Sequence, residues 1–198
     1  MNTSNTFGNI SDFAITYSPC PDSYNYVEQD KMAICHITIN SIIIGDLNEE
    51  CYLPTWFFNI SKLRNFIATN KDNLYITEFN NLSDREIFEL IIKSNQLQEE
   101  FDKDYLHLRQ LNNKIWEKHF LSLDETINNF LICYYIKDNK INFIVEKWWP
   151  ETGYQRNIQY HSVELSYFLD VLESTISFLE TKFPYLSIHS ASSTPNSR

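Results

Sequence analysis

The stretch Met32–Asp46, MAICHITINSIIIGD, predicts the structure around which the rest of the chain is arranged. Its second half is a run of isoleucines that ends at Gly45. In its first half, side chains alternate between two faces with a period of two, which is typical of a β-strand rich in β-branched residues. One face carries Ala33, Cys35, Ile37 and Ile39. Asn40 and Ser41 separate the halves, so the stretch predicts a β-hairpin that turns at these two residues.

A second hairpin is predicted near the C-terminal end, where two apolar runs flank the residues Lys137–Lys140, KDNK. Asp and Asn tolerate the positive φ that tight hairpin turns require. Three further strands are expected, whereas residues 1–11 are expected to be a lead-in without a strand. These strands are Asp12–Tyr17, a brief one within Lys71–Phe79, and Tyr154–Tyr160.

Helices are predicted where apolar residues recur every three or four positions. Ser83 and Glu86 form a capping box, which starts a helix that continues to about Phe120 as one long helix or as two helices. Asn59 or Ser61 caps a short helix, and Ser162 caps a helix that ends near Phe183. The expected fold class is therefore α+β, with an antiparallel sheet of about five or six strands and helices packed on one face.

The length of 198 residues and the hydrophobic content of 43% are typical of one folded domain. We expect this domain to span residues 1–188, followed by a polar, flexible tail at residues 189–198.

The net charge of −10 disfavours partners that are themselves anionic, such as nucleic acid or an acidic membrane surface. The acidity is concentrated in residues 1–60, which contain seven Asp or Glu residues and one Lys. A basic protein partner fits this distribution better than any polyanion.

The four cysteines show neither the close pairs of a zinc site nor the density of a disulfide framework. Reduced thiols fit them best, which predicts a cytoplasmic protein. The N-terminus lacks the basic and apolar regions of a signal peptide, and no apolar run is long enough to span a membrane.

No motif for catalysis, cofactor binding or metal binding is present. Three glycines are too few for a phosphate-binding loop, and no HExxH pattern occurs. Cys35 and His36 are neighbours on a predicted strand and therefore point to opposite faces, which rules out a dyad between them. His119 is expected on the surface. We predict no catalytic residue, no metal ligand and no cofactor.

The candidate partner-binding residues are acids of the first 60 residues, with two tryptophans as aromatic anchors. The acids are Asp22, Glu28, Asp30, Asp46, Glu49 and Glu50, and the anchors are Trp56 and Trp149. Two structural explanations remain open at this point. The acids can belong to an ordinary solvated loop, and the tryptophans can cover the core.

Several short motifs resemble immunity protein family 42 of bacterial polymorphic toxin systems. They are Phe7-Gly8-Asn9, Asp12-Phe13-Ala14-Ile15, Ile39-Asn40 and Ile44-Gly45-Asp46, and the resemblance covers mainly residues 7–67. Ser41 stands where the family pattern has glycine. The resemblance implies a protein that binds and neutralises a cognate toxin domain. An acidic surface suits the basic active site of a nuclease toxin.

Two other classes of function stay open from the sequence. One is a small-ligand binding or regulatory module with a pocket between sheet and helices. The other is an enzyme that uses scattered acids. No oligomeric state is predicted.

Overall fold

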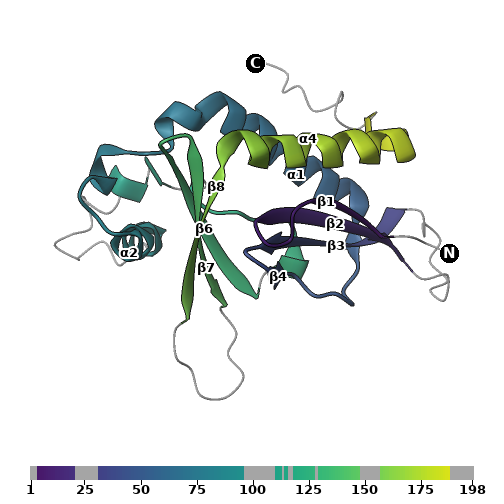
Figure 1. Ribbon diagram of the computed structural model, residues 1–198, viewed down its shortest axis with the longest axis horizontal. Helices are drawn as coiled ribbons and strands as arrows, with labels where there is room; N and C mark the ends of the chain where they lie inside the picture. Colours follow the sequence, from purple (N-terminus) through teal and green to yellow (C-terminus); the bar gives the residue numbers. More distant parts are fainter. Residues whose placement is uncertain are drawn as a thin grey trace. The chain divides into compact units, whose positions relative to one another are not determined.

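The computed structural model describes residues 4–20, 31–95, 110–112, 114–115, 118–127, 129–147 and 157–187. The chain divides into two compact units. Unit 1 contains Met1–Thr69, Leu123–Asn128 and Ser166–Arg198, and unit 2 contains Asn70–Ser122 and Asn129–Leu165. The predicted α+β class is confirmed, and the antiparallel strands form two sheets instead of the single sheet that was expected (Figure 1). The predicted tail at residues 189–198 lies outside the described residues.

Unit 1 is built on a five-stranded antiparallel sheet. Its strands are β1 (Asn5–Gly8), β2 (Phe13–Pro19), β3 (Met32–Ile39), β4 (Ile42–Ile44) and β5 (Cys51–Tyr52). The order is β1-β2-β3-β4, and β5 also pairs with β3. The predicted first hairpin is confirmed: Asn40 and Ser41 have φ angles of 49° and 64°, as a two-residue turn with two left-handed positions requires.

Strand β1 was not predicted, and contacts from distant residues hold it in place. The Tyr167 hydroxyl accepts a hydrogen bond from the Asn9 amide (2.6 Å) and donates to the Phe13 carbonyl oxygen (3.1 Å). Gly8 has a φ of +93°, and a Cβ there would come within 2.4 Å of the Phe13 carbonyl oxygen. The Phe7-Gly8-Asn9 motif is therefore a structural one, since only glycine fits this approach.

Two helices cover one face of this sheet, namely α1 (Leu53–Asn70) and α4 (Leu165–Lys182), both on the same side of the strands in Figure 1. The Phe7 and Phe178 rings lie 5.1 Å apart, and those of Phe13 and Phe168 lie 4.7 Å apart. Helix α1 starts earlier than predicted. Helix α4 starts later than predicted, because Ser162 continues strand β8 and pairs with Asn142.

Unit 2 contains a three-stranded antiparallel sheet in the order β6-β7-β8. The strands are β6 (Phe130–Lys137), β7 (Lys140–Lys147) and β8 (Ile158–Glu164). The second predicted hairpin is confirmed, with φ angles of 53° at Asp138 and 59° at Asn139. The strand predicted at Tyr154–Tyr160 is displaced toward the C-terminus, and residues 154–156 lie outside the described residues.

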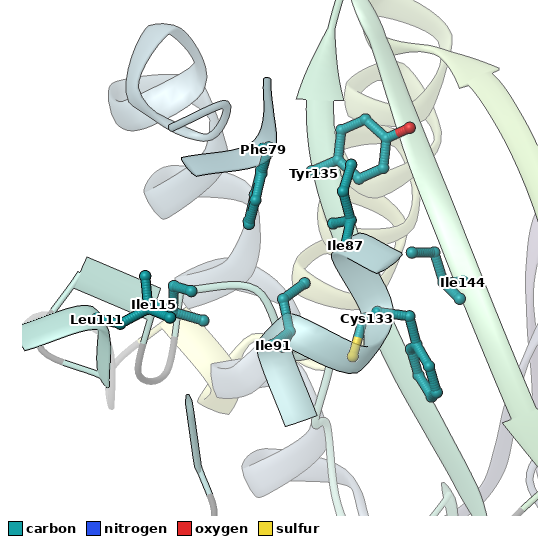
Figure 2. Close-up of a cluster of buried hydrophobic side chains, with 9 residues drawn as sticks. Phe79, Ile87, Ile91, Leu111, Ile115, Cys133, Tyr135 and Ile144 are labelled. Atoms are coloured by element: carbon teal, nitrogen blue, oxygen red, sulfur yellow. The ribbon is translucent and has the colours of Figure 1, made fainter. Parts of the chain in front are cut away.

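Helix α2 (Asp84–Asn95) packs on this sheet through a cluster of buried apolar side chains (Figure 2). The cluster contains Phe79, Ile87, Phe88, Ile91, Leu111, Ile115, Cys133, Tyr135 and Ile144. The predicted capping box is confirmed: the Ser83 amide donates to the Glu86 carboxylate (2.8 Å), and the Glu86 amide donates to the Ser83 hydroxyl (3.4 Å). Residues 96–109 lie outside the described residues. The prediction of one long helix or two helices in this region therefore stays a prediction.

The strand predicted within Lys71–Phe79 is wrong. This stretch forms two short 3-10 helices, η2 (Lys71–Asn73) and η3 (Thr77–Phe79). The Leu74 carbonyl oxygen between them accepts a hydrogen bond from the Ile136 amide (3.1 Å). A third 3-10 helix, η4 (Glu125–Ile127), belongs to unit 1.

Candidate functional site

The candidate site is the edge segment, which we define as Ile43–Tyr52. The chain leaves the sheet after β4 and returns to it at β5. Ile43 pairs with Thr38 of β3, and Tyr52 pairs with Met32 of the same strand. At about 3.3 Å per residue, Thr38 and Met32 are separated by ~20 Å. The edge segment therefore follows the sheet edge over this length.

Gly45 and Asp46 direct the chain away from the sheet. Gly45 has a φ of +114°, which favours glycine, and its nearest neighbour is the Cβ of His36 at 3.5 Å from the Cβ position. The Asp46 carboxylate accepts a hydrogen bond from the Asn48 amide (2.8 Å), and the Asp46 carbonyl oxygen accepts one from the Glu49 amide (3.4 Å). The first bond closes an Asx turn and the second closes a β-turn, and together they fix the backbone that carries the acids.

Three of the predicted acids lie in the edge segment. Asp46 and Glu49 are exposed, and Glu50 is half-buried. Burial raises the pKa of the Cys20 thiol to about 12, and the charge of the neighbouring Glu50 carboxylate adds to the effect. The Glu50 carboxylate is also hydrogen-bonded to this thiol. Glu50 is thus partly engaged inside unit 1, whereas Asp46 and Glu49 are available to a partner. The other predicted residues, Asp22, Glu28, Asp30 and Trp149, lie outside the described residues.

Trp56 is not a surface anchor, which corrects the sequence-based prediction. Its exposed fraction is 0%, and it faces the core of unit 1 together with Leu53 and Ile60. Because α1 begins at Leu53, these residues share one face at helical spacing. The predicted caps, Asn59 or Ser61, lie beyond Trp56, so the prediction left this residue outside the helix.

The apolar side chains of the edge segment were missed from the sequence. Large exposed apolar residues in the described part of the chain include Ile43 (42%), Leu47 (50%) and Tyr52 (44%). All three lie within ten residues of one another, interspersed with Asp46 and Glu49. The strand register would have identified Ile43, because it is the outward-facing member of the Ile42–Ile44 run.

The four cysteines and His119 are buried. Burial, followed by the hydrogen bond with Cys51, raises the pKa of Cys35 well above its ordinary value, so this thiol stays protonated. His119 is buried, contrary to prediction, and its Nδ1 donates to the Tyr134 carbonyl oxygen (2.9 Å). Burial lowers its pKa. Within the described ranges, no three His, Cys, Asp or Glu side chains gather closely enough to hold a metal ion.

Unit 2 contains an open hollow of about 420 Å³ beside the β6–β7 turn. Its lining residues are Lys71, Asp72, Tyr75, Ile136, Lys137, Asp138, Asn139 and Leu165. Lys137 lies over the Tyr75 ring, 4.9 Å from its centroid. Two exposed lysines and two exposed aspartates line the hollow. Their charges balance, so the lining favours neither an anionic nor a cationic ligand.

The sequence matches the family model of Immunity protein 42 over residues 2–178. The chain belongs to this immunity protein family. The match extends well beyond residues 7–67, to which the motif resemblance was mainly confined. No curated protein sequence matches the chain.

Among solved structures, CdiI from Burkholderia dolosa AUO158 is similar, with a TM-score of 0.53 and 14% sequence identity. The similarity covers 87% of this chain and 99% of that one, and at this identity it concerns the fold. Within the described residues of this Immunity protein 42 member, no helix is long and apolar enough to cross a bilayer.

Proposed function

We propose that this Immunity protein 42 member neutralises a cognate bacterial toxin domain by stoichiometric binding, through an acidic surface that includes Asp46, Glu49 and Glu50. Family membership supports the neutralising function, and the fold shared with a CdiI protein agrees with a role in contact-dependent growth inhibition. Binding, rather than catalysis, is the activity that the proposal requires.

One observation supports the location of the surface: two acids of the edge segment are exposed and held on an ordered turn. Asp22, Glu28 and Asp30 belong to the same acidic sequence region and complete the proposed surface. Trp149 stays in the proposal as an aromatic anchor. Because like charges repel and opposite charges steer encounter, such a surface selects a basic partner.

The proposed toxin class is a nuclease, whose active site must attract phosphate groups and is therefore basic. An acidic protein seated on such a site excludes the nucleic acid both by its volume and by its charge. We place this neutralisation in the cytoplasm, since the four cysteines are free thiols rather than disulfides.

The test is co-expression with the toxin domain encoded next to this gene. Wild-type protein is expected to restore growth, whereas D46K/E49K is expected to lose most of the protection and affinity. D72K/D170K is the matched control, because it changes the net charge equally at two exposed acids outside the edge segment.

The two parts of the proposal fail in different ways. A wild-type protein that neither binds the toxin domain nor restores growth contradicts the immunity function. Undiminished affinity and protection by D46K/E49K, with an active wild type, contradict the acidic surface alone.

A further inference from the structure

The three exposed apolar side chains of the edge segment are arranged as a strip. Thr38 and Met32 are an even number of residues apart on β3, so their partners Ile43 and Tyr52 lie on the same face of the sheet. Leu47 lies between them in the sequence, within the turn that the Asp46 carboxylate closes by its hydrogen bond with the Asn48 amide. The strip extends for ~20 Å, which is comparable with the core of a standard protein–protein interface.

The exposed side chains of the strip are not part of the core of unit 1. The opposite face of the sheet forms the core, where Phe7 and Phe13 contact α4. Leu47 and Tyr52 keep about half of their surface in solvent. A group of exposed apolar side chains with polar neighbours marks an interaction site more often than a single one does. Tyrosine is enriched among binding hot spots, and an apolar centre surrounded by a polar rim is the usual anatomy of a protein–protein interface.

We propose that Leu47 and Tyr52 are the hot spots of the edge segment, and that they bind an apolar patch ringed by Lys and Arg on the cognate toxin domain. Ile43 extends the contact at the end of the strip. This inference rests on the proposed function and adds the chemistry of the partner's surface.

Charge selects a toxin domain rather than a second copy of this chain as the occupant. Self-association through the strip would bring Asp46 and Glu49 of one copy against the same acids of another, in a protein of net charge −10. A basic rim on a different protein converts this repulsion into attraction.

The two kinds of side chain have separate kinetic roles. Charges act over a Debye length of about 8 to 10 Å, so Asp46 and Glu49 act before contact and raise the association rate. Leu47 and Tyr52 act only once water has been removed from the interface, so they slow dissociation.

The experiment measures association and dissociation rates with the purified, catalytically inactive toxin domain that is encoded next to this gene. L47A/Y52A is expected to raise the dissociation rate about tenfold or more, with little change in the association rate. D46N/E49Q keeps the turn and removes two charges. It is expected to lower the association rate several-fold at low salt, and the difference is expected to vanish at high salt.

Two further variants control for loss of folding and for general loss of apolar surface. Tyr52→Phe retains the ring and is expected to dissociate nearly as slowly as the wild type. Ile10→Ala removes a side chain that is 57% exposed and lies at the turn end of the first hairpin, where the Ser41 amide donates to the Ile10 carbonyl oxygen. Along β3 that position is ~25 Å from Tyr52.

The outcomes separate the inference from the function on which it rests. Wild-type binding with an unchanged dissociation rate for L47A/Y52A overturns the inference, as does an equal effect of Ile10→Ala. Self-association of the wild type that L47A/Y52A abolishes also overturns it, in favour of a second copy of the chain. Absence of wild-type binding overturns the proposed function itself.

Discussion

The two β-hairpins share the same turn chemistry but differ in how far their strands run. Asn40-Ser41 and Asp138-Asn139 each place two non-glycine residues at positive φ. Strands β6 and β7 pair over eight residues each, whereas β4 pairs with β3 over only three. The difference arises at Gly45, where a φ of +114° turns the chain out of the sheet.

The two hairpins also differ in how many of their residues are exposed. In β6–β7, most positions are buried, and Cys133, Tyr135 and Ile144 belong to the cluster in Figure 2. In β3–β4, the early exit frees the following residues from sheet geometry, so acids and apolar side chains face solvent together. The first hairpin therefore presents a surface, while the second stabilises unit 2.

The largest effect is expected from changing the residue that makes the hairpins differ. Gly45→Ala places a side chain at a φ that L-residues rarely adopt, although its nearest contact of 3.5 Å leaves room for the methyl group. We expect a loss of about 1–2 kcal/mol in the free energy of unfolding, from backbone strain alone. Urea denaturation measures it.

Asn139→Gly is the matched change in the second hairpin. Glycine relieves the strain of a positive φ that asparagine already tolerates, so stability should stay within about 0.5 kcal/mol. A loss below about 0.5 kcal/mol for Gly45→Ala would show that the backbone at this position does not require glycine.

A smaller effect is expected from pH, because each hairpin has a histidine with a depressed pKa beside its first strand. Burial lowers the pKa of His36 on β3 and of His119, which is hydrogen-bonded to β6. Below about pH 6.5 the unfolded chain binds protons that the folded protein does not. The free energy of unfolding should therefore fall from pH 7 to 5.5, and the fall should be smaller in His119→Gln and in His36→Gln than in the wild type.

This pH range separates the histidines from the carboxylates. The Lys114 ammonium hydrogen bond lowers the pKa of Glu78, and hydrogen bonds from Ser83 lower that of Glu86, so both stay ionised above pH 5.5. Urea midpoints across the range give the slope. A flat profile in the wild type would contradict the assignment of His119 as a buried neutral group.

Local sequence signals predicted the parts of the fold that depend on neighbouring residues. Asn40-Ser41, Asp138-Asn139 and the Ser83 capping box act within a few positions, and each is found as expected. Strand β1 could not be predicted this way, because Tyr167 holds it from 158 residues away. The Lys71–Phe79 run has a strand-like pattern, yet it folds into two short 3-10 helices, and Leu74 between them contributes a backbone hydrogen bond to β6.

The candidate site was predictable to a similar degree. Acid content along the sequence made Asp46 and Glu49 candidates, since charge is visible without a fold, and both are exposed. Pro54 in the first turn of α1 was a signal for an earlier helix start, and it would have placed Trp56 in the core. The exposure of Leu47 and Tyr52 depends on where β4 ends and β5 resumes, which the composition does not encode.

Amide hydrogen exchange of the wild-type protein, with and without the neighbouring toxin domain, tests most directly whether the edge segment binds the toxin. We predict slower exchange on binding across residues 43–52, and no change at the Asp138-Asn139 turn of the second hairpin. Protection elsewhere in a tight complex, with residues 43–52 exchanging as in the free protein, would contradict the assignment of this segment as the binding surface.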